Sequence, residues 1–244
     1  KPMVETIHCI VLRTVKYSDT MSIATVWTAE RGRMSVAVPS GSSREAKRLR
    51  AIMMPLGAFE AVARTSAGSD VARISDVRSL IESPAASGNP TKSVVAMFLA
   101  DFLYNVLKEC TPDALMTEFL MQWLDALRRI GGMALANFHL AFAFRLGQFL
   151  GIAPDMGSYH RGRYLDLKEG RYTATAPLHT LYLEPDDAHA AWLLSRISLR
   201  TLGMLRLNRS QRNIMLDRIL QYYSLHHAPV QNMPALAFLR DVWA

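Results

Sequence analysis

Cysteines and long apolar segments are both scarce in this chain. Of its 244 residues only Cys9 and Cys110 are cysteines, and two distant thiols give no disulfide framework. Such a composition is typical of a reducing compartment. No run of 18 uncharged apolar residues is present, and the first residues lack the apolar core of a signal peptide. We therefore expect a cytoplasmic protein that does not enter a membrane.

Catalytic motifs are absent as well. The sequence has no Gly-rich phosphate loop of the Walker type, no dinucleotide-binding fingerprint and no His-Glu-x-x-His pair. Asp186 and Asp187 begin a predicted helix, where carboxylates offset the helix dipole, and His226-His227 end another. No carboxylate cluster suited to Mg²⁺ is visible, which disfavours a nuclease. The sequence predicts a protein that is not an enzyme and has no small-molecule substrate, cofactor or metal.

Acidic residues are few in the N-terminal third. The whole chain carries 28 Lys and Arg against 21 Asp and Glu, a net charge of +7. Residues 1–80 alone hold 12 of these basic residues against 7 acidic ones, so most of the excess lies there. An excess of positive charge favours anionic partners such as nucleic acid, acidic tails or anionic lipid.

Short alternating segments fill the first eighty residues. Apolar and polar residues alternate in each, as in strands with one buried face. Gly32 suits the positive-φ position of a hairpin loop. Five such segments without a long helix between them predict a small antiparallel barrel, with an OB-fold as the leading candidate and an SH3-like barrel as the alternative. The expected strands are Ile7–Val15, Ser22–Thr28, Arg33–Val38, Gly57–Arg64 and Val71–Ile81.

A group of cations follows the third predicted strand. Four basic residues fall within seven positions of what reads as a polar loop, opposed only by Glu45. In an OB-fold, single-stranded nucleic acid crosses one face of the barrel, held by basic loops and stacked on aromatic rings. We expect such a face here; the alternative is a solvated loop, with the rings of Tyr17, Trp27 and Phe59 in the core. The expected DNA contacts are Arg13, Lys16, Tyr17, Arg31, Arg33, Arg44, Lys47, Arg48 and Arg50.

Beyond residue 82 the apolar spacing becomes helical. A Ser/Pro/Gly-rich segment, 83–90, separates a first domain, 1–82, from a second, 91–244. Strand alternation returns once, at Gly162–Thr175, and predicts an isolated hairpin within 155–183. The sequence thus predicts an α+β multidomain fold, an OB-fold barrel followed by a helical domain with a small hairpin insertion. The expected helices are Thr91–Glu109 (with Thr91 as N-cap), Pro112–Ile130, Met133–Gly151, Glu184–Leu205, Ser210–His227 and Met233–Trp243.

Three stretches resemble the bacterial RecO family of DNA repair proteins, and they follow one another along the chain in the same order as in the family. "FAFRLGQFLGIAPD" resembles the family's helix end "FxLRLLxxLGYxPx", and "LDRILQYYSLHH" resembles its late helix "LxxxLxxYxxxHL". The opening "CIVLRTVKYSDTMSIATVWTAERGRMSVAVPSGSS" resembles the family's first strands. In it Val11-Leu12-Arg13, Tyr17, Asp19, Thr28, Glu30, Gly32 and Arg33 stand at the matching places.

The resemblance implies an N-terminal OB-fold, a helical domain and, in many members, a four-cysteine zinc module after the "LGYxP" segment. This chain departs from the family there. Between Asp155 and Leu183 it has no cysteine, only His160 and His179. We therefore expect the hairpin to replace the zinc module and no zinc to be bound.

The resemblance also implies a recombination mediator. Such proteins bind single- and double-stranded DNA, anneal complementary strands, and work with RecR to load RecA onto DNA coated by single-strand binding protein (SSB). They act in the bacterial cytoplasm at the nucleoid. The alternative from another class is an adaptor whose barrel and helices bind only protein.

A partner site follows from the same resemblance, because the family binds the acidic, Phe-ending tail of SSB. Such a tail needs an apolar slot and a cation. Phe142, Leu146 and Phe149 share one helical face, and Arg145 borders it. These four are the expected tail-binding residues; the alternative is that the whole helix is core, with Arg145 at its edge.

Overall fold

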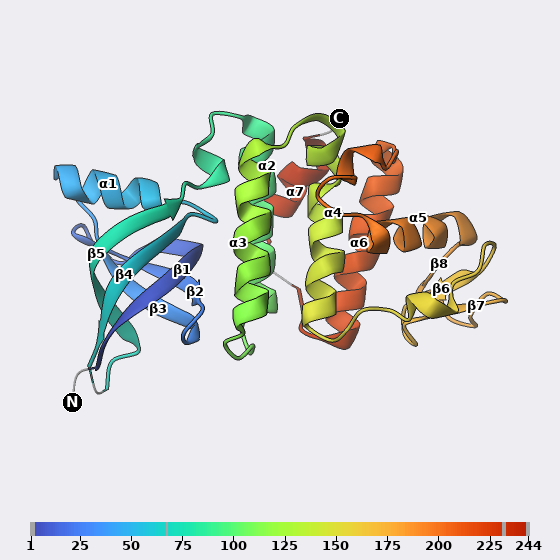
Figure 1. The fold of residues 1–244 in the computed structure, drawn as a ribbon, viewed down its shortest axis with the longest axis horizontal. Helices are drawn as coiled ribbons and strands as arrows, with labels where there is room; N and C mark the ends of the chain where they lie inside the picture. The colour runs from blue at the N-terminus through green and yellow to red at the C-terminus, as the bar shows by residue number, and fades with distance from the viewer. Residues whose placement is uncertain (1–2, 67, 231–232, 243–244) are drawn as a thin grey trace. The chain divides into compact units, whose positions relative to one another are not determined.

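Five strands form a closed barrel at the start of the computed structural model, which describes residues 3–66, 68–230 and 233–242 (Figure 1). Around the barrel the order is β1-β2-β3-β5-β4, and β4 pairs back with β1. All neighbours are antiparallel except β3 and β5. This order confirms the OB-fold. The strands are β1 (Met3–Lys16), β2 (Met21–Thr28), β3 (Gly32–Pro39), β4 (Ala58–Thr65) and β5 (Val71–Ile81).

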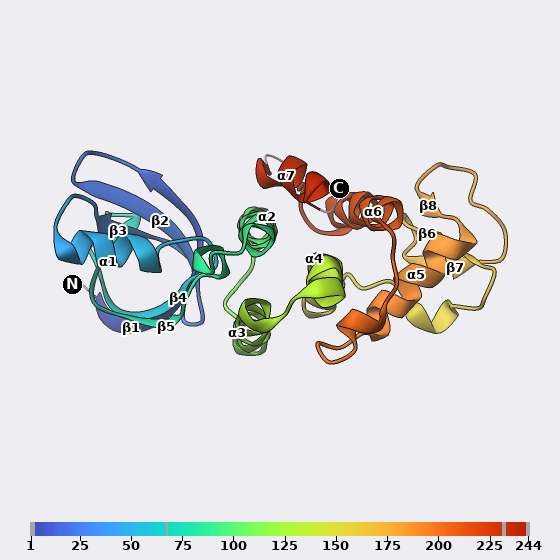
Figure 2. The same ribbon diagram turned by 90° about the horizontal axis from the view of Figure 1, so that it is seen from above.

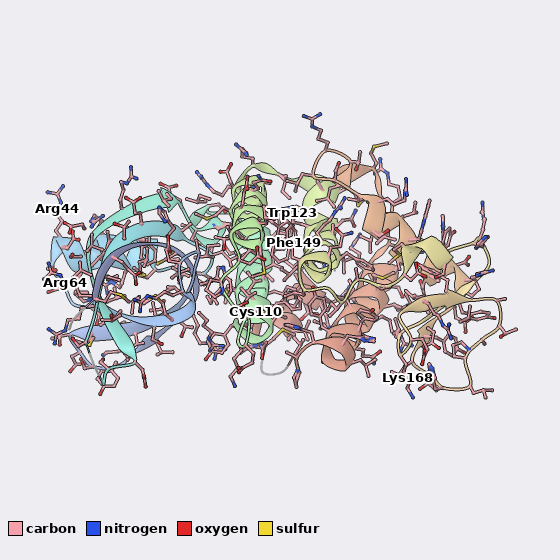
Figure 3. The ribbon with its side chains drawn as sticks, turned by 60° about the horizontal axis from the view of Figure 1, so that its bottom comes forward. Arg44, Arg64, Cys110, Trp123, Phe149 and Lys168 are labelled. Atoms are coloured by element: carbon pink, nitrogen blue, oxygen red, sulfur yellow. The ribbon has the colours of Figure 1, made fainter. Side chains whose placement is uncertain are left out.

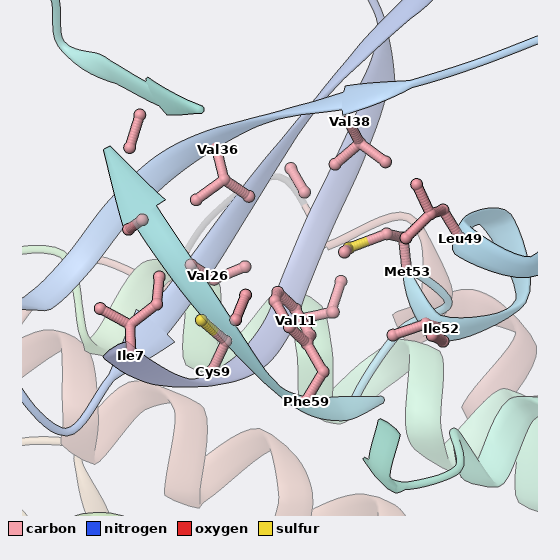
Figure 4. Close-up of a cluster of buried hydrophobic side chains, with 14 residues drawn as sticks. Ile7, Cys9, Val11, Val26, Val36, Val38, Leu49, Ile52, Met53 and Phe59 are labelled. Carbon is pink, nitrogen blue, oxygen red and sulfur yellow. The ribbon is translucent and has the colours of Figure 1, made fainter. Parts of the chain in front are cut away.

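A short helix, α1 (Arg44–Ile52), lies across one end of the barrel (Figures 1 and 2). Ser43 caps it, because its hydroxyl accepts a hydrogen bond from the backbone N–H of Ala46. The expected cation-bearing loop is therefore wrong: the cations are on a helix. Its nine residues are too few to hold a helix in water alone. The contacts of Leu49 and Ile52 with the barrel interior stabilise it (Figure 4).

The barrel core consists of the inward-facing side chains of all five strands (Figure 4). Cys9 is buried among them, and burial raises the pKa of its thiol. Trp27 and Phe59 are also fully buried. Their rings cannot stack with a base, so the reading that places these two rings in the core is confirmed.

The contacts within the described chain divide it into two compact units. The first joins the barrel to three helices and a turn, and Trp27 takes part in this contact: its Nε1 donates to the Thr117 hydroxyl at 3.0 Å. Gly32, at φ 70°, lies so near the helices that an added Cβ would be 3.3 Å from the Cys110 carbonyl oxygen. These elements are η1 (Pro84–Ala86), α2 (Pro90–Val106), α3 (Ala114–Arg129) and α7 (Ala235–Asp241).

The second unit holds the remaining helices and a three-stranded sheet of order β7-β6-β8, which confirms the hairpin insertion. Tyr159 ties this region to α5, since its ring stacks on Trp192 with centroids 4.6 Å apart and its hydroxyl lies 2.5 Å from His189 Nδ1. The elements are α4 (Gly132–Phe149), η2 (Met156–Ser158), β6 (Tyr164–Asp166), β7 (Arg171–Thr173), β8 (Tyr182–Leu183), α5 (Pro185–Arg196), η3 (Leu202–Met204) and α6 (Arg209–His226).

Among the expected helices, every end except that of α5 lies within three residues of expectation, and two of the differences have a clear physical cause. Asn89, not Thr91, caps α2: its side chain accepts from the Lys92 backbone N–H at 3.1 Å, and Pro90 fills the first helical position. Helix α5 ends at Arg196 instead of Leu205. The carbonyl of Ile197, directly after this end, accepts a hydrogen bond from Arg145, which lies 52 positions earlier. The local sequence pattern cannot reveal such a contact.

Candidate nucleic-acid interface

The four cations of α1 differ in what they contact. Arg48 donates to both carboxylate oxygens of Glu45, at 2.6 and 2.9 Å, and to the Val77 carbonyl at 3.0 Å. These bonds lower the pKa of Glu45. Arg50 donates to the Gly41 carbonyl at 2.9 Å.

The side chains of the other two cations of α1, Arg44 and Lys47, are exposed and have no hydrogen bond or ion pair with any residue that the structure describes. Arg44 extends outward from the barrel in Figure 3. An exposed side chain without a partner keeps its full charge available for an anion. Arg44 and Lys47 are therefore the members of this group best placed to meet a phosphate.

Three of the expected DNA contacts hold the first unit together instead. Arg13 and Arg33 place their guanidinium carbons 4.1 and 4.0 Å from the centre of the Tyr104 ring on α2. Arg33 also donates to the Tyr104 carbonyl at 2.9 Å, and Arg13 lies 3.6 Å from Asp101. Arg31 pairs with Glu5. All three side chains are engaged within the protein: Arg13 and Arg31 each face a carboxylate, and Arg33 contacts a carbonyl and a ring.

The end of β1 carries two further expected contacts. Lys16 is paired with the fully exposed Asp19 at 2.7 Å, a surface ion pair worth little. Tyr17 begins the connection to β2 and is 71% exposed. Its ring, unlike those of Trp27 and Phe59, can stack on a base. In OB-folds this connection and the one between β4 and β5 border the ligand-binding face.

Two cations at the other connection were missed from the sequence. Arg64 is the last residue but one of β4 and Arg73 the third residue of β5, and both are exposed. The signal was present: both occupy outward positions of their alternating strands and flank the turn between them. The sequence pattern did not join them to the basic residues of 31–50, because they lie outside that segment of the chain.

An acidic patch lies elsewhere on the barrel surface. His8 contacts Glu30 at 2.6 Å and Glu60 at 3.2 Å. The hydrogen bond with Glu30 and the charges of both carboxylates raise the pKa of His8. Since Glu60 also pairs with Arg78, this part of the surface balances its own charges and offers no net attraction to phosphate.

The expected tail-binding residues on α4 do not form an open slot. Phe142 and Leu146 are fully buried, and only Phe149 of these three, 42% exposed, reaches the surface. Arg145 is also engaged: Nε and Nη2 donate to the Ile197 carbonyl, and Nη1 to Gln148. The expected slot is therefore wrong, since its face of α4 packs into the core of the second unit.

A different face of α4 borders a small apolar hollow with a volume of about 30 Å³. Phe144 and Gly147 of α4, Leu165 of β6 and Tyr222 of α6 are among its walls, and Arg218 is the charged residue of its lining. The hydroxyl of Tyr223 donates to the Ala143 carbonyl at 2.6 Å, which ties α6 to α4 at this place. The hollow combines the apolar surface and the cation that were expected of the α4 face.

Comparison with known proteins covers nearly the whole chain. The family model "Recombination protein O N terminal" matches residues 3–82, and "Recombination protein O C terminal" matches residues 87–232. The chain belongs to the RecO family. It is 32% identical to the DNA repair protein RecO of Bacteroides fragilis over 96% of this chain and 97% of that one. It is 33% identical to the RecO of Porphyromonas gingivalis over 91% and 92%, and 23% identical to that of Flavobacterium psychrophilum over 96% and 97%.

Membership of the RecO family makes this a DNA repair protein with a bacterial ancestry. None of the helices described in the structure is long and apolar enough to cross a membrane. At the place of the RecO zinc module, His179 is bonded within the protein, 3.3 Å from Asp166, and also accepts from the Leu181 backbone. Within residues 3–66, 68–230 and 233–242, no three His, Cys, Asp or Glu side chains form a group that could hold a metal ion.

Proposed function

We propose that this RecO-family protein is a non-catalytic recombination mediator of the bacterial cytoplasm and nucleoid. It binds single- and double-stranded DNA, anneals complementary strands, and together with RecR helps to load RecA onto SSB-coated single strands. The observation that carries the proposal is the pair of exposed, unpartnered cations Arg44 and Lys47 on an OB-fold barrel.

The cations expected to contact DNA have three roles in this proposal. Arg44 and Lys47 contact phosphate, with Lys16 and the Tyr17 ring at the edge of the face. Arg48 and Arg50 add positive potential while their donors remain bonded to the protein. The remaining three, Arg13, Arg31 and Arg33, hold the first unit together, because each already has a partner there.

An annealing assay tests this proposal against the protein-only adaptor. Two complementary oligonucleotides, one carrying a fluorophore and the other a quencher, are mixed with the protein, with and without cognate SSB. A mediator accelerates quenching in both mixtures, and salt slows it because phosphate contacts release counterions. An adaptor leaves the rate at the protein-free value.

We further propose that the SSB tail binds in the hollow beside Gly147 and not on the Phe142 face. A terminal Phe ring needs apolar walls, and the hollow supplies them from α4, residues 152–154, the β6 region, β8 and α6 of the second unit. Its terminal carboxylate needs a donor, for which Arg218 at the lining has N–H groups besides the Nη1 that donates to Gln221 at 2.9 Å. Burying one phenyl ring is worth roughly 1.5–3 kcal/mol and a bond to a charged group roughly 1.5–3 more. These values suit a contact that exchanges readily during loading.

A further inference from the structure

Arg64 and Arg73 are direct cross-strand partners in the antiparallel pair β4–β5. Both lie at exposed positions, whereas their neighbours Ala63 and Ala72 point into the barrel core, so the two guanidinium groups share the outer face. Directly opposite side chains on one face have Cβ atoms about 4.5–5.5 Å apart. Two positive charges are therefore held close together by the backbone itself.

This arrangement works against folding. Like charges directly opposite each other destabilise a sheet, and neither guanidinium has a hydrogen bond or ion pair with any residue in the described part of the chain. Elsewhere the same barrel does compensate its charges: Glu60, on the same strand as Arg64, is paired with both His8 and Arg78. An uncompensated pair of this kind is what a binding site for an anion requires.

The surroundings of the pair also suit a nucleic-acid backbone. The row of paired residues that contains the two arginines runs across the barrel through Val4, Arg64, Arg73, Ala37 and Ile23. The neighbouring outward row holds Thr25, Ser35 and Val71. Neither row contains an acid, and the β2–β3 side chains are short or uncharged. A polyanion can therefore lie across β5, β3 and β2 without meeting negative charge.

We propose that Arg64 and Arg73 together grip one backbone phosphate of a single strand that crosses the β2–β3–β5 face. The inference rests on the proposed DNA-binding function and adds a phosphate site to it. Each guanidinium presents parallel N–H groups that match phosphate oxygens, so two forks on adjacent strands can share one phosphate. Binding also removes the repulsion between the two arginines.

The test compares the salt dependence of single-strand binding for wild type and Arg64→Gln/Arg73→Gln. The control is Arg161→Gln/Arg206→Gln, which removes the same charge from two exposed arginines of the second unit whose side chains have no hydrogen bond or ion pair among the described residues. Binding of fluorescent oligothymidylate is measured by anisotropy over a range of salt concentrations. Inorganic phosphate is added in a parallel series, to separate capture of a free ion from binding of the strand.

The proposal predicts that the Arg64/Arg73 variant loses affinity several-fold and that its log–log salt slope flattens by about 0.7, the value for one single-strand phosphate contact. The control keeps the wild-type slope. Inorganic phosphate should displace no more oligonucleotide than another salt does at the same ionic strength. Equal slopes in wild type and the Arg64/Arg73 variant, both binding DNA, overturn this site alone. Absence of binding by wild type overturns the proposed function itself.

Thermal unfolding gives a second readout. Because the pair repels, Arg64→Gln/Arg73→Gln without DNA should melt at the wild-type temperature or above it. A lower melting temperature would show that the arginines stabilise the barrel, which contradicts the proposal. Arg64→Lys/Arg73→Lys, which keeps the charge but loses the forked donors, should bind DNA with an affinity between those of wild type and the Gln variant.

Discussion

Arg33 lies against Tyr104, with its guanidinium carbon 4.0 Å from the ring centre and its Nη1 donating to the Tyr104 carbonyl at 2.9 Å. The contact joins β3 of the barrel to α2, over 71 positions of sequence. It explains why positive charge beside a strand does not by itself indicate a DNA contact. A cation in such a place can equally hold the barrel to its neighbouring helices.

Replacement of this ring should cost stability without affecting DNA contacts. In Tyr104→Leu both Arg13 and Arg33 lose a cation–π partner, each worth about 0.5–2 kcal/mol. We expect the free energy of unfolding to fall by about 1–2 kcal/mol, measured by urea denaturation, with an unchanged salt slope for single-strand binding. Tyr17→Leu is the control: its exposed ring should change stability by less than about 0.5 kcal/mol. Equal stability of the two variants would contradict the role of Tyr104.

The tail-binding hollow can be narrowed by one methyl group. In Gly147→Ala the new Cβ lies 3.5 Å from the Tyr223 hydroxyl and 3.6 Å from Ile152, which are ordinary contacts. Alanine also favours the helix by roughly 0.8–1 kcal/mol. We expect a protein that is at least as stable as wild type but binds a labelled, acidic, Phe-ending peptide several-fold more weakly.

Two arginines distinguish the hollow from the α4 face first expected. Arg218→Gln should weaken peptide binding about tenfold or more, since it removes a bond to a charged group. Arg145→Gln should lower stability, because the Ile197 carbonyl loses its donor, but leave peptide affinity unchanged. The reverse pattern, with Arg145 essential and Arg218 neutral, would return the site to the Phe149 side of α4.

Zinc content is a prediction that depends on the hairpin. With no cysteine in 155–183 and His179 bonded to Asp166, elemental analysis of the purified protein should find well under one zinc per chain. A chelator should leave the melting temperature unchanged. Stoichiometric zinc that is lost in His179→Ala would show that His160, His179 and nearby carboxylates form a site.

Two histidines make stability depend on pH in opposite directions. Burial, and to a smaller extent Arg212, lower the pKa of His139 to about 3. Its unfolded pKa is about 6.5. Between these values the unfolded chain binds the extra proton, so the free energy of unfolding falls as the pH falls, by up to about 1.4 kcal/mol per pH unit. The penalty is absent above about pH 6.5.

His8 behaves in the other sense. Its pKa is raised, so its stabilising contribution is present below about pH 6.5 and is lost as the pH rises through the raised value. Urea denaturation of His139→Gln and His8→Gln over the range from about pH 5 to 8 separates the two. In His139→Gln the free energy of unfolding should fall less steeply as the pH is lowered. In His8→Gln it should fall less steeply as the pH is raised. An unchanged pH dependence in His139→Gln would contradict a buried neutral imidazole.

Strand alternation and Gly32 were enough to predict the barrel, because each strand has one face in the core and one outside. Helix α1 was missed since its residues Leu49 and Ile52 become helical only by packing against the barrel. The end of α5 was misplaced because Arg145, some fifty positions earlier, bonds the Ile197 carbonyl. In both cases a tertiary contact decides the local structure.

The candidate site could be predicted only in part, again because tertiary contacts decide which side chains are available. The sequence identified the excess of cations but could not show which were compensated by Glu5, Asp101 or Tyr104. It also could not bring Arg64 beside Arg73, because only the β4–β5 register pairs them. On α4 the spacing of Phe142, Leu146 and Phe149 placed them on one face of the helix. It could not show that most of this face is buried.

The salt dependence of single-strand binding by wild type and Arg44→Gln/Lys47→Gln tests the central claim most directly. These two α1 cations are exposed and have no partner in the described chain, so their removal should leave stability unchanged. If they contact phosphates, the variant binds oligothymidylate more weakly whatever the base sequence, and its log–log slope flattens by up to about 1.4, or about 0.7 per contact. An unchanged slope and affinity would mean that this face of the barrel does not contact DNA.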